Sequence, residues 1–203
     1  MAELVCADPG PLPVGPVGRS GMGWWGVATL IASEAALFGF LIFAYFYVGA
    51  TAQPGWLLEP APKLFPALPN TLLLLASSGA AWWGEKGVER GRRHQAVAGL
   101  LGAFVMGAVF AGVQAYEWSV KTYGMGESSY ASLYYVTTGL HMAHVLVGLV
   151  ILLTLAAWTA AGFFSQVRWI PVSAGILYWH FVDVVWLFVF ATYYLTPYLG
   201  FPQ

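Results

Sequence analysis

The chain has little charge and almost no cysteine. Only 8% of its 203 residues are charged, and eight basic residues nearly balance nine acidic ones. A soluble domain carries about 25% charged residues, so an ordinary soluble domain is excluded. The net charge of −1 gives no basic surface for nucleic acid. The single cysteine, Cys6, excludes an intrachain disulfide and a metal site built from several cysteines.

Several familiar motifs are also missing. Residues 1–22 are rich in proline and glycine and lack the basic start and apolar centre of a signal peptide. We therefore expect them to form a retained, extended tail. The sequence has no internal repeat, no glycine-rich phosphate loop and no nucleophile motif. These patterns give no indication of a soluble-type active site.

The sequence is rich in long hydrophobic runs. Its residues are 59% hydrophobic, and its mean hydropathy is +0.70. A membrane-spanning helix needs about 20 mostly apolar residues. Five apolar runs meet or approach this length, at about 23–48, 68–84, 96–118, 130–161 and 171–197. The second run is barely long enough. The sequence predicts an all-α polytopic membrane protein, a bundle of five transmembrane helices covering residues 23–203.

The distribution of lysine and arginine predicts the orientation of the bundle. Basic residues accumulate on the cytoplasmic side of membrane proteins. With a cytoplasmic N-terminus, the inner segments hold six basic residues and the outer segments two, Lys63 and Lys121. The six are Arg19, Lys86, Arg90, Arg92, Arg93 and Arg168. We therefore expect a cytoplasmic N-terminus and a periplasmic C-terminus.

Small residues mark one face of the third predicted span. Ala103, Gly107, Ala111 and Ala115 recur at every fourth position. Such a stripe lets another helix approach closely, which is how helices associate in lipid. We expect this face to pack inside the bundle.

Ionisable residues lie deep in the predicted spans. Glu34 is about 15 Å from the start of the first span, at the rise of an α-helix. His141 and His144 share a face of the fourth span, and His180 and Asp183 share a face of the fifth. All five fall at a similar depth, and intramembrane ionisable groups are functional candidates. A buried network of acid–histidine hydrogen bonds is the simplest interpretation; a metal or haem site and a proton pathway are alternatives.

Two further polar groups lie at span ends. Gln114 and Glu117 end the third span, where we expect an interfacial hydrogen-bonding role. The most charged stretch, residues 85–95, separates the second and third spans. It is expected to act as an orientation signal and to contact anionic lipid headgroups. Its basic members are Lys86, Arg90, Arg92 and Arg93.

Five segments together resemble subunit III of the haem-copper oxidases. WWGVATLIASEAALFGFLIFAYFYV (24–48) resembles the family's helix with an intramembrane acid, and PNTLLLLASSGAAWW (69–83) resembles the helix that follows it. VQAYEW (113–118) is similar to the family's Gln-Ala-x-Glu-Tyr/Trp segment. TTGLHMAHVLVGLVIL (137–152) matches Thr-Gly-x-His-x-x-His-Val-x-x-Gly. YWHFVDVVWLFVF (178–190) matches the family's most recognisable stretch, and the matches run in order over residues 24–194.

The resemblance implies an accessory subunit of an aerobic terminal oxidase in a bacterial inner membrane. Haem and copper are then expected in partner subunits I and II, with no cofactor and no metal in this chain. The family is thought to support proton uptake into subunit I and to protect it from inactivation during turnover, partly through bound phospholipid. By the same resemblance, Glu34 corresponds to the acid known for carbodiimide reactivity, and the other intramembrane polar groups become a structural network.

The sequence also departs from the family pattern. Many members have seven spans, and this chain matches from their third, so a five-span form is expected and lipid binding in the family's cleft is in doubt. The usual Trp-x-His-His is replaced by Trp82-Trp83-Gly84-Glu85. The long match at 178–190 favours cytochrome c oxidase. A quinol oxidase or nitric-oxide-reductase-associated subunit, a stand-alone proton channel or transporter, and an independent haem or metal enzyme remain alternatives.

Overall fold

Five long helices form the described part of the chain. The computed structural model describes residues 22–58, 62–166 and 168–201. The helices are α1 (Met22–Thr51), α2 (Leu64–Glu89), α3 (Arg93–Ser119), α4 (Ser129–Ala161) and α5 (Ile170–Phe190). A π-helical segment, η1 (Ala191–Leu195), and a 3-10 turn, η2 (Thr196–Leu199), continue α5. The predicted extended tail, Met22 apart, and its Cys6 lie outside the described residues.

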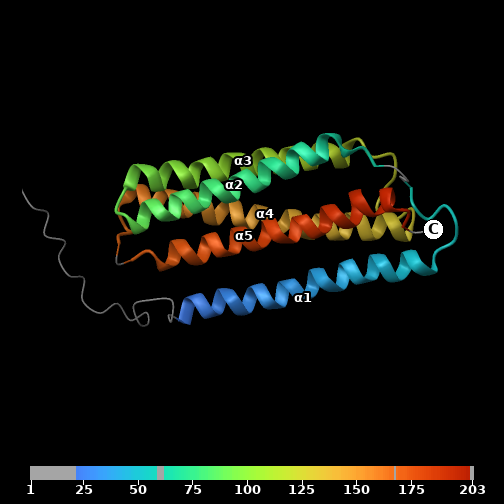
Figure 1. Cartoon of the computed structure of the whole chain (residues 1–203), viewed down its shortest axis with the longest axis horizontal. Coiled ribbons are helices and arrows are strands. Elements are labelled where there is room, and N and C mark those ends of the chain that lie inside the picture. Colours follow the sequence, from blue (N-terminus) through green and yellow to red (C-terminus); the bar gives the residue numbers. More distant parts are fainter. Residues whose placement is uncertain (1–21, 59–61, 167, 202–203) are drawn as a thin grey trace, which may run out of the picture.

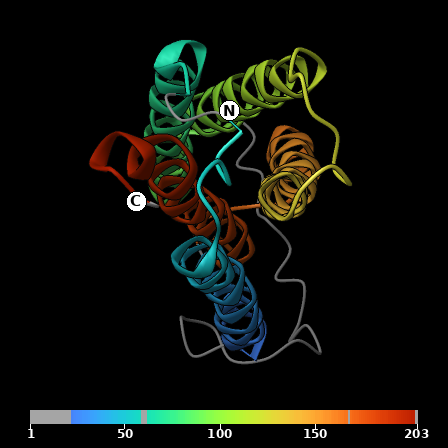
Figure 2. The ribbon, with the colours of Figure 1, turned by 90° about the vertical axis from the view of Figure 1, so that its right-hand side faces the viewer.

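The helices run antiparallel along one long axis (Figure 1). All five are long and apolar enough to cross a membrane, and no strand occurs in the described ranges, which confirms the predicted fold class. Seen end-on, α5 lies at the centre, α2 and α3 lie together on one side, and α1 lies on the opposite side (Figure 2). The side to which each end of the bundle belongs stays a prediction.

Helix α2 is longer at both ends than the predicted 68–84. Its first turns contain Pro66, which lies in the proline-rich segment that the sequence placed before the helix, and Pro69, which lies within the predicted span. Pro69 has no N–H for the carbonyl of residue 65, and Phe65 has a non-helical backbone (φ −99°, ψ 126°). The hydrogen bond that Pro69 cannot form would join it to Phe65, where the backbone is already non-helical, so Pro69 interrupts no regular helical turn.

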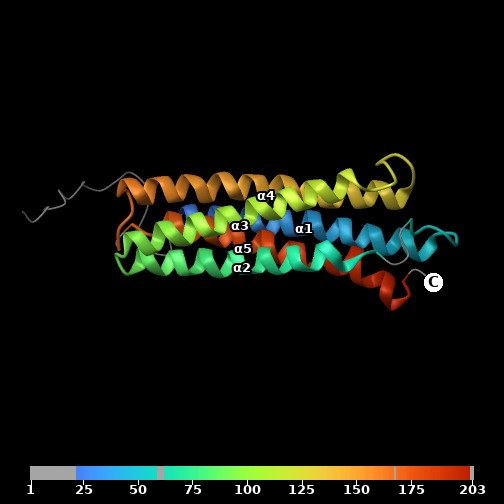
Figure 3. The ribbon, with the colours of Figure 1, turned by 90° about the horizontal axis from the view of Figure 1, so that it is seen from above.

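Helices α2 and α3 touch through their backbones. A Cβ atom added at Gly99 would lie 2.5 Å from the Cα of Gly84, and one added at Gly87 would lie 2.6 Å from the nitrogen of Ala96. Small residues allow this approach, and the gain in lipid is van der Waals contact over the length of the pair. The two helices lie side by side in both long views (Figures 1 and 3).

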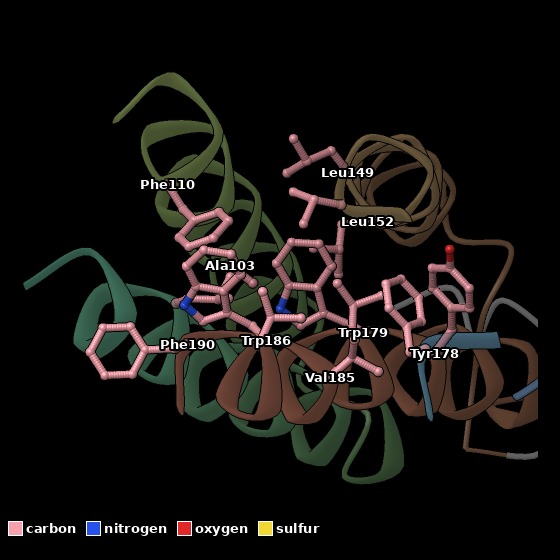
Figure 4. Packing of buried hydrophobic residues seen from close by; sticks show 14 of the residues in the cluster. Ala103, Phe110, Leu149, Leu152, Tyr178, Trp179, Val185, Trp186 and Phe190 are labelled. Carbon is pink, nitrogen blue, oxygen red and sulfur yellow. The ribbon is translucent and has the colours of Figure 1, made fainter. Parts of the chain in front are cut away.

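The predicted small-residue stripe of α3 is packed over only part of its length. Ala103 and Gly107 are buried, Ala111 is half-buried and Ala115 is exposed. At Gly107 an added Cβ would lie 2.6 Å from the indole of Trp179, and at Gly148 of α4 the same indole is also 2.6 Å away. The Trp179 ring, fully buried, therefore fills the space that these two glycines leave between α3 and α4. Figure 4 shows this ring projecting from α5 toward both helices.

Helix α1 packs along a single stripe. Phe38, Leu41 and Tyr45 are buried at helical spacing, and the helix contacts α4 and α5. Its other faces carry exposed apolar side chains, among them Phe40 and Phe43. The helix stands apart from α2 and α3 in both Figure 1 and Figure 2.

Candidate functional site

The intramembrane acid Glu34 pairs with His144 across the seam between α1 and α4. Glu34 lies on the same stripe of α1 as Phe38 and Leu41, so the packing of that stripe directs its carboxyl group toward α4. Its Oε2 lies 3.1 Å from Nε2 of His144, while Nδ1 of His144 lies 2.8 Å from the carbonyl oxygen of Leu140. The side chains are 26% and 17% exposed, so the pair sits at the edge of the bundle.

Hydrogen-bond counting fixes how many protons this pair holds. The Leu140 carbonyl can only accept, so Nδ1 of His144 carries a hydrogen. The remaining bond then contains one proton, which is either on Glu34 or on Nε2 of His144. In both forms the pair is neutral overall, which lowers the cost of placing two ionisable groups in the membrane. The pair can therefore hold a proton that either partner can release.

A second cluster links α2 to α5. The Ser78 hydroxyl forms hydrogen bonds with Oδ2 of Asp183 and, at 2.7 Å, with Nδ1 of His180. Asp183 is buried, whereas Ser78 and His180 are half-buried. His180 and Asp183 share one face of α5, as their spacing predicts, and Ser78 of α2 is the group that connects them.

His141 belongs to neither cluster. Its Nε2 donates to the carbonyl oxygen of Val182 at 3.2 Å, and its ring packs among Phe38, Phe110 and Trp186. Its Nδ1 has no hydrogen-bond partner among the described residues. His141 therefore fills space between α4 and α5 and joins the two helices through one hydrogen bond. The five residues expected in one network thus occur, within the described ranges, as two separate polar clusters and one core histidine.

The sequence did not single out the hydroxyl groups of α2 that complete the links to α5. Trp186 donates through Nε1 to Thr71 Oγ1 at 2.9 Å, and Trp179 donates to Ser77 Oγ at 3.0 Å. With Ser78, these groups form a ladder along the α2–α5 contact. The signal was present in the spacing, because positions 71 and 78 differ by seven and therefore share one face of a helix.

Glu117 and Gln114 lie inside the end of the bundle. Both are buried, although the sequence placed them at an interface. The Tyr194 hydroxyl donates to Oε1 of Glu117, and the Lys121 ammonium lies 3.6 Å from the same oxygen. The Lys121 ammonium also lies 5.1 Å from the centre of the Tyr134 ring. These contacts join α3, α4 and η1, so Glu117 fastens this end of the bundle.

The predicted lipid-headgroup residues divide into two kinds. Lys86 forms a 2.7 Å ion pair with Glu89, which offsets its charge. Arg90, Arg92 and Arg93 are exposed at the turn between α2 and α3. Their exposure leaves these three side chains accessible at one end of the bundle.

The acids of these sites have neighbours that can share a proton. No group of three or more His, Cys, Asp or Glu side chains that could hold a metal ion occurs in the part of the chain that the structure describes. Each acid instead contacts a group that can share its proton, namely His144, Ser78 or Tyr194.

Comparisons with known proteins agree with the family that the sequence motifs resemble. A sequence model of the family "Cytochrome c oxidase subunit III" matches residues 17–198. The cytochrome c oxidase subunit 3 of Drosophila yakuba is 33% identical over 178 residues, which cover 84% of this chain and 68% of the relative. The subunit 3 of Anopheles gambiae is 34% identical with the same coverage. The subunit 3 of Marchantia polymorpha is 32% identical over 178 residues, which cover 84% of this chain and 67% of the relative.

Proposed function

Because the chain belongs to the cytochrome c oxidase subunit III family, we propose that it is the accessory, non-redox subunit III of an aerobic haem-copper terminal oxidase. In this role it stabilises the catalytic subunit and supports proton uptake during oxygen reduction. The chain is a multi-pass membrane protein, and we place it in the inner membrane of a bacterium.

The observation that carries this proposal is the Glu34–His144 pair on the partly exposed seam between α1 and α4 of a family-matched bundle. The pair lies deep in two spans, holds one proton between its partners and is partly exposed at the edge of the bundle. A partly exposed pair can exchange its proton with groups outside the chain, whereas a fully buried one is closed off. This geometry supports a role in keeping protons available to a neighbouring subunit.

The proposed partners are the catalytic subunit I, subunit II and phospholipids. Haem and copper belong to the partner subunits in this proposal and supply the oxygen-reducing chemistry there. The residues of this chain bind no cofactor in it, and its histidines serve as hydrogen-bond and packing groups. Exposed apolar faces on α1, such as that of Phe40 and Phe43, provide surface for a neighbouring helix or for lipid.

Two measurements test the proposal. Oxidase purified with this chain is expected to keep its rate of oxygen consumption over many turnovers, and oxidase without it to lose activity progressively. Optical spectra and metal analysis of the isolated chain are expected to show no stoichiometric haem or metal. Haem or metal retained by the chain alone, or identical turnover lifetimes with and without it, would overturn the accessory role.

A further inference from the structure

Ser78, His180 and Asp183 form a chain of hydrogen bonds between α2 and α5 that ends at a buried carboxyl group. Ser78 lies within bonding reach of both other residues, and His180 and Asp183 do not bond each other directly among the described contacts. Any proton that moves between His180 and Asp183 must therefore pass through the Ser78 hydroxyl.

The single hydrogen of Ser78 allows two arrangements. In the first, the hydroxyl donates to ionised Asp183, so Nδ1 of His180 must donate to the Ser78 oxygen. In the second, Asp183 is a neutral acid that donates to the Ser78 oxygen, and the hydroxyl donates to Nδ1 of His180. Both arrangements satisfy every donor in the chain.

One concerted step converts the first arrangement into the second. The Nδ1–H bond of His180 breaks as that proton joins the Ser78 oxygen, and the original Ser78 O–H bond breaks as its proton joins Oδ2 of Asp183. If His180 starts as an imidazolium, it ends neutral with its hydrogen on Nε2, and Asp183 ends as a neutral acid. Charge and protons balance within this step, because the imidazolium loses one proton and the carboxylate gains one; the imidazolium itself forms earlier, when a proton joins Nε2 of His180.

The burial of Asp183 favours the neutral acid as the resting form. The residue is 2% exposed, and its Oδ1 has no hydrogen-bond partner among the described residues. An ionised carboxylate would leave part of its charge unsolvated at that oxygen, whereas a neutral acid leaves only a carbonyl oxygen there. Burying an unpaired carbonyl oxygen costs less free energy than burying an unpaired oxygen of a carboxylate.

The more accessible end of this chain of hydrogen bonds is His180. This side chain is half-buried, and His180 lies about one helical turn closer than Asp183 to the charged α2–α3 turn. Glu85 lies seven residues after Ser78 on α2, hence on the same face, and interacts electrostatically with His180. Tyrosines apart, the other ionisable groups on the helices that pack most against α5 are Glu34 of α1, Lys86 and Glu89 of α2, and His141 and His144 of α4.

We propose that Ser78, His180 and Asp183 form an intramembrane proton-binding site, in which Asp183 stores one proton that arrives through His180 and Ser78 from the Glu85 end of the bundle. The proposal concerns this chain alone and does not depend on its assembly into an oxidase. It is separate from the Glu34–His144 pair, which lies on the seam between α1 and α4.

The storage step can be tested without altering the site. The sequence contains only two aspartates, Asp8 and Asp183, so Asp8→Asn leaves one. The full Asp8→Asn chain, labelled with carbon-13 at the aspartate side-chain carboxyl, is placed in lipid nanodiscs and titrated by infrared spectroscopy. The proposal predicts an isotope-shifted carbonyl band of a protonated carboxylic acid that disappears as the pH rises. If only carboxylate bands occur at every pH at which the chain stays folded, the proposal is overturned.

The route is tested by exchange of the same proton with deuterium. In Ser78→Ala, exchange of the Asp183 proton is expected to slow by about tenfold or more, because the bridging hydroxyl is lost. Ser78→Thr keeps the hydroxyl and should restore the normal rate. Ser77→Ala is the matched control, since that hydroxyl bonds Trp179.

His180→Gln provides a second variant, because it removes the titrating ring and keeps a polar head. It should also slow exchange at Asp183. Normal exchange in the folded Ser78→Ala chain, or in His180→Gln where Ser78→Ala does not fold, would overturn the route. Equal slowing in Ser77→Ala would overturn it too, since the effect would then come from general packing of α2.

Discussion

Helix α1 and the group α2–α5 are built in different ways. In α5, 56% of the most apolar stretch is buried within the chain, whereas in α1 the corresponding share is 11%. Glycines let α2 and α3 touch backbone to backbone, and two more hold Trp179 between α3 and α4. Helix α1 is attached by one stripe and by the Glu34–His144 pair. Helices α2–α5 therefore determine their own packing, while most of the surface of α1 is available to lipid or to another subunit.

The largest expected effect comes from Gly99→Ala in the tight region. The added Cβ would lie 2.5 Å from the Cα and 2.6 Å from the nitrogen of Gly84, and backbone atoms cannot rotate away. Overpacking of this kind costs about 3 kcal/mol. We expect a large loss of folded, monodisperse chain and a lower unfolding temperature in detergent. Gly112→Ala is the control on the same helix, since nothing lies within 4 Å of its added Cβ; equal loss in both variants would contradict close contact at Gly99.

A smaller effect is expected from Gly148→Ala. The added Cβ would meet the Trp179 ring at 2.6 Å, but a side chain can shift where a backbone cannot. We expect destabilisation of about 2 kcal/mol, with a change in the fluorescence or near-ultraviolet dichroism of tryptophan. Gly139→Ala, on the same helix and free of neighbours within 4 Å, should match the wild type. An unchanged tryptophan signal in Gly148→Ala would show that the ring is not held there.

Tyr194→Phe should cost less again. It removes the hydrogen bond from η1 to Glu117 and leaves Lys121 as the partner of that carboxylate. Hydrogen bonds between helices in membranes contribute about 1 kcal/mol. Thermal unfolding in detergent measures the loss, and Tyr198→Phe is the control, because that exposed hydroxyl bonds Pro62 near the surface. A larger loss in Tyr198→Phe than in Tyr194→Phe would contradict the fastening role of Glu117.

The smallest effect is expected for Glu34→Gln in α1. Glutamine can still donate from its amide to Nε2 of His144, so the seam keeps its hydrogen bond and loses only the transferable proton. We expect intact assembly, a stability change of about 0.5 kcal/mol and a modest decrease in steady-state oxidase activity. Activity is measured on the assembled complex. Complete loss of oxygen reduction in a fully assembled complex would contradict this prediction.

Most of the fold could be predicted from the sequence, because long apolar runs leave few alternatives to membrane-spanning helices. The start of α2 could not, since Pro66 belongs to a proline-rich segment that indicates a break in a place where the helix has already begun. The partial packing of the α3 stripe was also hidden, because alanine is equally suited to lipid and to a helix interface.

The candidate site was predictable by residue type and less so by partner. Spacing placed His141 and His144 on one face, yet one bonds Val182 and the other Glu34, because residues three apart still point about 60° apart and so meet different helices. Ser78 was not singled out, since serine is common in membrane helices and often bonds its own helix, as Ser77 does to Leu74. Its spacing from Thr71 was the signal that could have placed it on the face toward α5. Tyr194, whose hydroxyl group bonds Glu117, lies 77 residues away in the sequence, and no local pattern encodes that contact.

Affinity purification from the native membrane shows whether this chain is an accessory subunit of a haem-copper oxidase. The chain is tagged, extracted in mild detergent and isolated, and the partners are identified by mass spectrometry and by the haem spectrum of the preparation. The account predicts stoichiometric recovery of a haem-copper subunit I. Recovery of the folded chain without such a subunit, under conditions in which the oxidase itself stays intact, would contradict it.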